Sequence, residues 1–104
     1  MELTGKCKVD FKKWYYESYL NYLDDLNRAM KFSAFNFETL TDSMKYGVFV
    51  DFFDSVGRYI SLNQYDESFW FDIEPAGFDS NYFDNRQEAR ISAIKEANKI
   101  HNKI

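Results

Sequence analysis

The chain of 104 residues contains few of the side chains that form disulfides, metal sites or turns. Its one cysteine, Cys7, excludes an internal disulfide, and with the one histidine, His101, it supplies too few ligands for a common structural zinc site. One proline and four glycines predict long elements with few breaks. Neither a secretory pattern nor an apolar run near the roughly 18 residues of a membrane span is present. The sequence predicts one soluble, cytoplasmic domain over residues 1–104.

The middle of the chain, by contrast, is acidic and rich in aromatic rings. Residues 38–84 hold ten carboxylates, twelve aromatic residues and only two basic side chains, for a net charge of −8. The flanks are basic, with +1 over residues 1–37 and +3 over residues 85–104. An acidic surface of this kind attracts basic partners and steers their approach.

Two N-terminal helices are predicted from the spacing of apolar residues. Rings and aliphatic side chains recur at three- and four-residue steps over residues 6–30, followed by a loop over 31–37. The second helix should begin at Thr39 or Thr41, either of which can cap the first turn, and end at Gly57. Gly47 inside this helix suggests a close crossing with another helix.

Two strands and a last helix follow. Residues 58–63 and 68–74 alternate between apolar and polar positions, joined by a hairpin loop over 64–67, and residues 76–82 form either a short third strand or a loop. The last helix begins at Asp84 or Asn85, where Asn85 and Glu88 have the spacing of a capping box. The predicted fold is α+β in the order α-α-β-β-(β)-α, with helices covering one face of a small antiparallel sheet.

Few groups are suited to catalysis. A Cys–His pair requires Cys7 and His101 to meet, although Cys7 is expected to pack as a small apolar residue and His101 to be solvated near the chain end. Asp51 and Asp54 are neighbours on one helix face, and Asp72 and Glu74 share one strand face. Such carboxylate pairs serve glycoside hydrolysis or magnesium binding. The simpler interpretation is that they occupy solvated faces.

Nucleic-acid binding is the other alternative. Two basic groups could track phosphates, namely Lys6, Lys8, Lys12 and Lys13 near the start and Arg86, Arg90, Lys95 and Lys99 near the end. The rings of Tyr59, Trp70 and Phe71 could stack on bases. The carboxylates beside these rings and the overall charge of −4 would repel phosphate, so nucleic acid is not the favoured partner.

Three segments carry a resemblance to a known group of proteins. They are GKCKVDFKKW at residues 5–14, MKYGVFVDFFDSVG at residues 44–57 and NRQEARISAIKEAN at residues 85–98. The chain resembles small uncharacterised proteins of phages, prophages and mobile elements in Bacteroides-type gut bacteria. The resemblance implies a bacterial or phage cytoplasm and an accessory role, such as modulating a host or phage protein. It carries no known activity, so it assigns no functional residues.

The sequence thus favours a non-catalytic module that binds a host or phage protein with a basic surface. It suggests no cofactor, metal or membrane partner, and it leaves open a small carboxylate-based or metal-dependent enzyme and a nucleic-acid-binding protein. Exposed strand edges would also allow a homodimer. The candidate partner-binding residues are Asp51, Asp54, Tyr65, Asp66, Trp70, Asp72 and Glu74.

Overall fold

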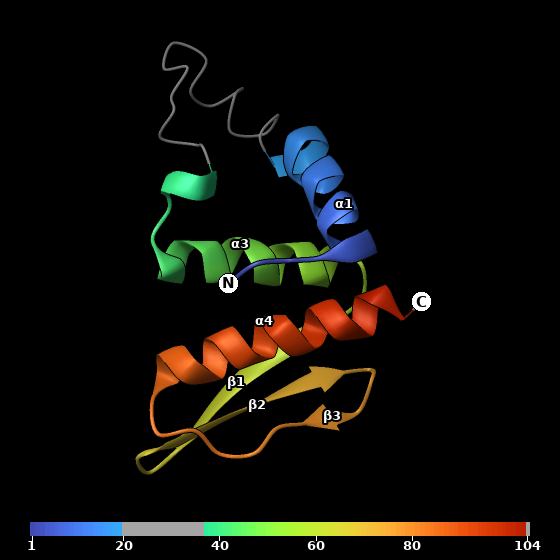
Figure 1. Ribbon diagram of the computed structural model, residues 1–104. Coiled ribbons are helices and arrows are strands. Elements are labelled where there is room, and N and C mark those ends of the chain that lie inside the picture. The colour runs from blue at the N-terminus through green and yellow to red at the C-terminus, as the bar shows by residue number, and fades with distance from the viewer. Residues whose placement is uncertain (20–36, 104) are drawn as a thin grey trace.

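The computed structural model describes residues 1–19 and 37–103 as an α+β fold in the predicted order. N-terminal helices precede a three-stranded antiparallel sheet, and a long helix ends the chain (Figure 1). The helical elements are α1 (Gly5–Trp14), a π-helical turn (Tyr15–Tyr19), a 3-10 turn (Phe37–Thr39), α3 (Asp42–Ser55) and α4 (Arg86–Asn102). The strands are β1 (Tyr59–Tyr65), β2 (Ser68–Glu74) and β3 (Phe78–Asp79).

The sheet has the order β1-β2-β3, with each strand antiparallel to its neighbour. Ile60 pairs with Ile73 and Leu62 with Phe71, which places apolar residues of both strands on one face. Phe71 and Ile73 are buried there, and α4 packs across this face. The predicted alternation of both strands is therefore confirmed, and the polar residues between these positions lie on the opposite face.

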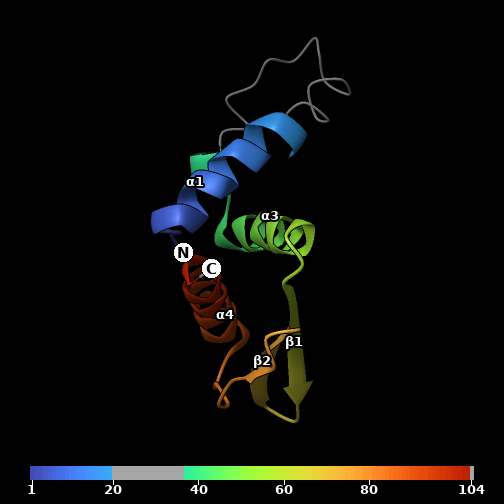
Figure 2. The ribbon, with the colours of Figure 1, turned by 90° about the vertical axis from the view of Figure 1, so that its right-hand side faces the viewer.

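Among the described helices, α4 lies across the covered face of the sheet, whereas α3 packs against α4 and lies beyond the start of β1 (Figure 2). In Figure 1 α4 lies next to the sheet, α3 lies beyond it, and α1 is the outermost of the three. Phe11 of α1 joins α1 to α3, because its ring centroid lies 5.1 Å from that of Phe49 and 5.5 Å from that of Phe52. Aromatic side chains thus fill much of the core between helices, as large rings do in small domains. Within the described residues, no helix is long and apolar enough to cross a membrane.

The helix boundaries follow the predicted capping signals. Thr41 is the N-cap of α3, and its hydroxyl accepts a hydrogen bond from the Met44 amide. Asn85 is the N-cap of α4, and its Oδ1 accepts from the Glu88 amide at 2.8 Å. Gly57, just after α3, has a φ of 78°, the left-handed conformation that glycine adopts without a Cβ penalty.

Other details differ from the sequence predictions. Gly47 does not mark a close crossing, because a Cβ at this exposed position would meet nothing within 4 Å. The hairpin loop has two residues, Asp66 and Glu67, instead of four, since β1 continues to Tyr65 and Asp66 adopts a φ of 58°. The third strand is limited to Phe78–Asp79. Residues 20–36, which include the last part of the predicted first helix and most of the following loop, lie outside the described residues.

Candidate functional site

The candidate site is the face of the sheet that α4 leaves uncovered. The alternation of β1 and β2 brings eight side chains to this open face, and the strand register sets them in opposed pairs. These pairs are Tyr59 with Glu74, Ser61 with Asp72, Asn63 with Trp70, and Tyr65 with Ser68. Figure 2 shows α4 on one side of the strands and the other side free of described helices. We refer to these eight residues, with Asp79 and Tyr82 described next, as the open face.

Aromatic rings form one part of the open face. Tyr59 and Tyr65, at the two ends of β1, are 54 % and 75 % exposed. Trp70 is half-buried, and its ring meets that of Tyr82 edge-on with centroids 5.4 Å apart. Tyr82 is itself 68 % exposed. Amphipathic rings of this kind, with one polar end and a large apolar body, are common in protein interfaces.

Carboxylates form the other part. Asp72 lies directly opposite Asp79 of β3, and Glu74 follows two positions along the same strand. Asn63 donates a hydrogen bond from Nδ2 to Asp72 Oδ2 at 2.9 Å, which fixes the orientation of that carboxylate. Like charges opposed across strands are destabilising. Among the residues the structure describes, no lysine or arginine forms a salt bridge with Asp72, Glu74 or Asp79.

The seven residues predicted from the sequence fall into separate groups. Tyr65, Trp70, Asp72 and Glu74 lie on the open face, and Asp66 lies in the adjoining hairpin turn. The remaining two, Asp51 and Asp54, are exposed on α3.

Asp51 and Asp54 on α3 are separate from the open face. Asp51 and Asp54 lie one helical turn apart on the side of α3 away from its buried residues. Partial burial raises the pKa of Asp54, and the nearby Asp51 carboxylate raises it further. In the described parts of the chain, no hydrogen bond or ion pair links this pair to the sheet. Whether either group binds a partner stays a prediction.

Six members of the open face were not among the predicted site residues, namely Tyr59, Ser61, Asn63, Ser68, Asp79 and Tyr82. Tyr59 has the same strand parity as Tyr65, so the alternation of β1 could have included it. Asp79 and Tyr82 could not be placed from the sequence, because their positions depend on the register of the two-residue strand β3 and the segment after it.

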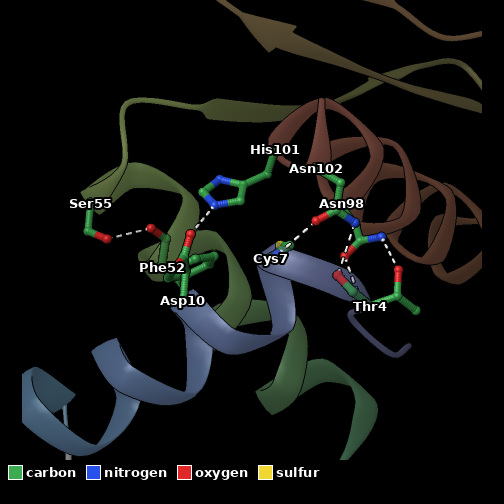
Figure 3. A network of polar contacts seen from close by, with 8 residues as sticks. All are labelled: Thr4, Cys7, Asp10, Phe52, Ser55, Asn98, His101 and Asn102. Atoms are coloured by element: carbon green, nitrogen blue, oxygen red, sulfur yellow. Dashed lines mark hydrogen bonds and ion pairs between the residues drawn. The ribbon is translucent and has the colours of Figure 1, made fainter. Parts of the chain in front are cut away.

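A second polar cluster lies between α1 and α4 (Figure 3). Asn98 accepts a hydrogen bond from the Thr4 amide through Oδ1 and donates from Nδ2 to the Thr4 hydroxyl, both at 2.9 Å. Asn102 Oδ1 accepts from the Cys7 amide at 2.8 Å. Further along, His101 Nε2 lies 2.7 Å from Asp10 Oδ2. These contacts join residues more than 90 positions apart and attach the start of the chain to its last helix.

His101 is therefore not the solvated residue that its position near the end of the chain suggested. It is 6 % exposed, because α4 is fully helical to Asn102 and α1 and Phe52 pack beside it. The hydrogen bond with His101 is the main reason why the pKa of Asp10 is lowered. No other polar group of the described chain contacts His101 Nδ1.

This cluster lacks the features of a Cys–His nucleophile. Cys7 and His101 both lie at the α1–α4 interface, but no hydrogen bond joins them among the described residues. Cys7 is fully buried, as predicted for a small apolar residue, and this burial raises the pKa of its thiol to about 12. A thiol nucleophile requires the opposite shift, toward the thiolate. We interpret the cluster as structural.

The arginines proposed to track phosphates have contacts inside the protein. Arg86 lies over the Phe69 ring and donates to Gln64 Oε1, and Arg90 lies over the Tyr46 ring and donates to Ser43. Side chains held against rings in this way are less available for a backbone of phosphates. The described residues also contain no group of three or more His, Cys, Asp or Glu side chains placed to hold a metal ion.

Comparison with known proteins adds no further evidence about function. No family model matches the sequence, and no curated protein or solved structure is significantly similar to it.

Proposed function

We propose that this protein is a non-catalytic binding module whose open face takes up a basic segment of a partner protein. The observation that supports the proposal is the pairing of Asp72 with Asp79 beside Glu74, with no cation of the described chain bridging them. A lysine or arginine supplied by a partner would relieve the repulsion between these opposed carboxylates. Charge complementarity of this kind provides specificity and fast association.

The rings beside the carboxylates match the same type of partner. The rings of Trp70 and Tyr82 contact each other beside the acidic pair Asp72 and Asp79, and Tyr59 lies directly opposite Glu74. A guanidinium or ammonium group binds favourably over such rings, and arginine also stacks on them. An extended segment with alternating basic and apolar residues would satisfy both parts of the open face. Following the resemblance in the sequence, we propose a host or phage protein in a bacterial cytoplasm as its source.

The proposal can be tested with a defined peptide, acetyl-Arg-Val-Arg-Val-Arg-amide, titrated into labelled protein at low ionic strength and followed by NMR. We expect chemical-shift changes at Asn63, Trp70, Asp72 and Asp79. The double variant Asp72→Asn/Asp79→Asn should weaken binding about tenfold or more, because charge-assisted hydrogen bonds contribute about 1.5–3 kcal/mol each.

A matched control separates a specific site from the overall charge. The double variant Asp51→Asn/Asp54→Asn removes the same two charges from α3 and should leave the affinity nearly unchanged. Equal weakening by both pairs, or shifts confined to α3, would show that the peptide responds to net charge and would rule out the open face as the site. Affinity capture from the native host with the wild type and the two double variants would then identify the natural partner.

A further inference from the structure

The outer edge of β1 is a second surface of interest, because no described strand covers it. The sheet order leaves β1 paired with β2 alone, and in Figure 2 β1 lies at the outer margin of the sheet. The backbone directions can be read from β2. Phe69 exchanges backbone hydrogen bonds with Phe83, and the Phe71 carbonyl accepts from the Ser80 amide. The backbone hydrogen-bonding groups of Phe69 and Phe71 therefore point toward the β3 side of β2.

The alternation of an antiparallel pair then fixes the direction of the β1 groups. Because the backbone groups of Phe69 and Phe71 point toward β3, those of the even-numbered residues of β2 form hydrogen bonds with β1. Their partners are the odd-numbered residues of β1. The even-numbered residues Ile60, Leu62 and Gln64 therefore direct their amides and carbonyls outward. Outside the sheet ladder, no backbone hydrogen bond among the described residues uses these groups.

This edge lacks the features that usually prevent strands from pairing with one another. Natural edge strands are short or carry lysine, proline or a bulge. β1 has seven residues, contains no charge and no proline, and pairs with β2 without a break in register. The opposite edge is different, because β3 has only two residues. The uncovered edge of β1 is thus suited to pairing with another strand.

We propose that the occupant of this edge is β1 of a second copy of the chain, paired antiparallel about Leu62. In this register Leu62 faces its counterpart, Ile60 faces Gln64, and the outward backbone groups of each copy meet those of the other. Ser61 faces Asn63 and Tyr59 faces Tyr65, all four on the open face. The result is a continuous six-stranded sheet with two-fold symmetry, and each pair unites residues from the same face.

Charge favours a second copy over an unrelated strand. The same register sets the position of Arg58 opposite that of Asp66 in the other copy, twice per dimer. Arg58 forms no salt bridge with any residue of the described chain. The acidic pair Asp72 and Asp79 lies on β2 and β3, away from the seam between the copies.

The proposed dimer does not depend on peptide binding to the open face. Two double variants test it, and they differ only in the sign of the charge placed at position 65. Tyr59→Lys/Tyr65→Lys sets lysine against lysine at both ends of the seam, whereas Tyr59→Lys/Tyr65→Glu sets lysine against glutamate. Both tyrosines are exposed, so both variants should keep the far-ultraviolet circular dichroism of the wild type. Analytical ultracentrifugation from micromolar to millimolar concentration measures the dissociation constant.

A single pair of seven-residue strands is a small interface, so we expect a weak, concentration-dependent dimer of the 12.5 kDa chain. The Lys/Lys variant should bind itself at least about tenfold more weakly than the Lys/Glu variant, because opposed like charges destabilise and opposed unlike charges stabilise cross-strand pairs. The amides of Ile60, Leu62 and Gln64 should also exchange with deuterium more slowly as the wild-type concentration rises.

Two results would overturn this proposal. One is a wild type that stays monomeric up to millimolar concentration, which would leave the edge free or reserved for a strand of another protein. The other is a dimer whose dissociation constant is the same for both variants, or whose formation does not protect the three amides, which would place the contact elsewhere.

Discussion

The reactivity of Cys7 provides a direct measure of how tightly α1 is held against α4. The side chain is fully buried, and the pKa of its thiol is raised from 9.0 to about 12, mainly by burial and then by the Asp10 carboxylate. At about pH 8 this shift reduces the thiolate population about a thousandfold relative to the unfolded chain. Alkylation also requires the reagent to reach the sulfur, which adds the free energy of opening the interface.

The assay is a time course of iodoacetamide labelling followed by mass spectrometry, in native buffer and in urea. The control is Cys7→Ala/Lys8→Cys, which moves the thiol to the adjacent, exposed position of the same helix. We expect the native wild type to react at least about a thousandfold more slowly than the control, and the two to react similarly in urea. Native labelling within about tenfold of the control would refute the packing of Cys7 described above.

The same shift makes a prediction about alkaline pH. Because the folded pKa lies above the unfolded value of 9.0, the fold favours the protonated thiol. This stabilisation is complete below about pH 9 and is lost progressively as the pH rises toward 12. The free energy of unfolding of the wild type should therefore fall more steeply above about pH 9 than that of Cys7→Ala, as measured by urea titration.

Three further predictions concern stability, each measured by urea or thermal unfolding. Gly47→Ala should stabilise the protein by up to about 1 kcal/mol, since the exposed helical position has room for a Cβ; a loss of stability would contradict this. Asn98→Ala should destabilise it by about 1–3 kcal/mol, because two hydrogen bonds with Thr4 disappear; a change within experimental error would refute their importance. The hydrogen bond with His101 lowers the pKa of Asp10, so it stabilises the fold above about pH 4, and this stabilisation is lost as the pH falls through the lowered pKa. The free energy of unfolding of Asp10→Asn should therefore fall less steeply in acid than that of the wild type. The same pH dependence in both proteins would exclude this contribution.

Local sequence patterns predicted most of the fold. The alternation in residues 68–74 gave β2 with the observed bounds, and the spacing of Asn85 and Glu88 gave the start of α4. Both signals act within a few residues, where backbone geometry and capping determine the structure. The parity of β1 and β2 likewise predicts that Ser61 and Asp72 share a face.

Local sequence patterns could not predict the features that depend on contacts between residues far apart in the sequence. The burial of His101 follows from α1 packing beside the end of α4, and the Asp10 that receives its hydrogen bond lies 91 positions earlier. The opposition of Asp79 and Asp72 depends on the register of a two-residue strand, for which a period of two is no guide. The sequence placed Asp51 and Asp54 on a helix, but it could not show that no hydrogen bond or ion pair among the described residues joins them to the open face.

The hydrogen bonds between Thr4 and Asn98 also constrain the order in which the chain can fold during synthesis. The two residues are 94 positions apart, so the helix that leaves the ribosome first must wait for the last helix before its polar contacts can form. In the interval the rings of Phe11 and its neighbours are exposed to water or rest only on α3. The nascent protein would then be most vulnerable to aggregation and proteolysis just before translation of α4 is complete.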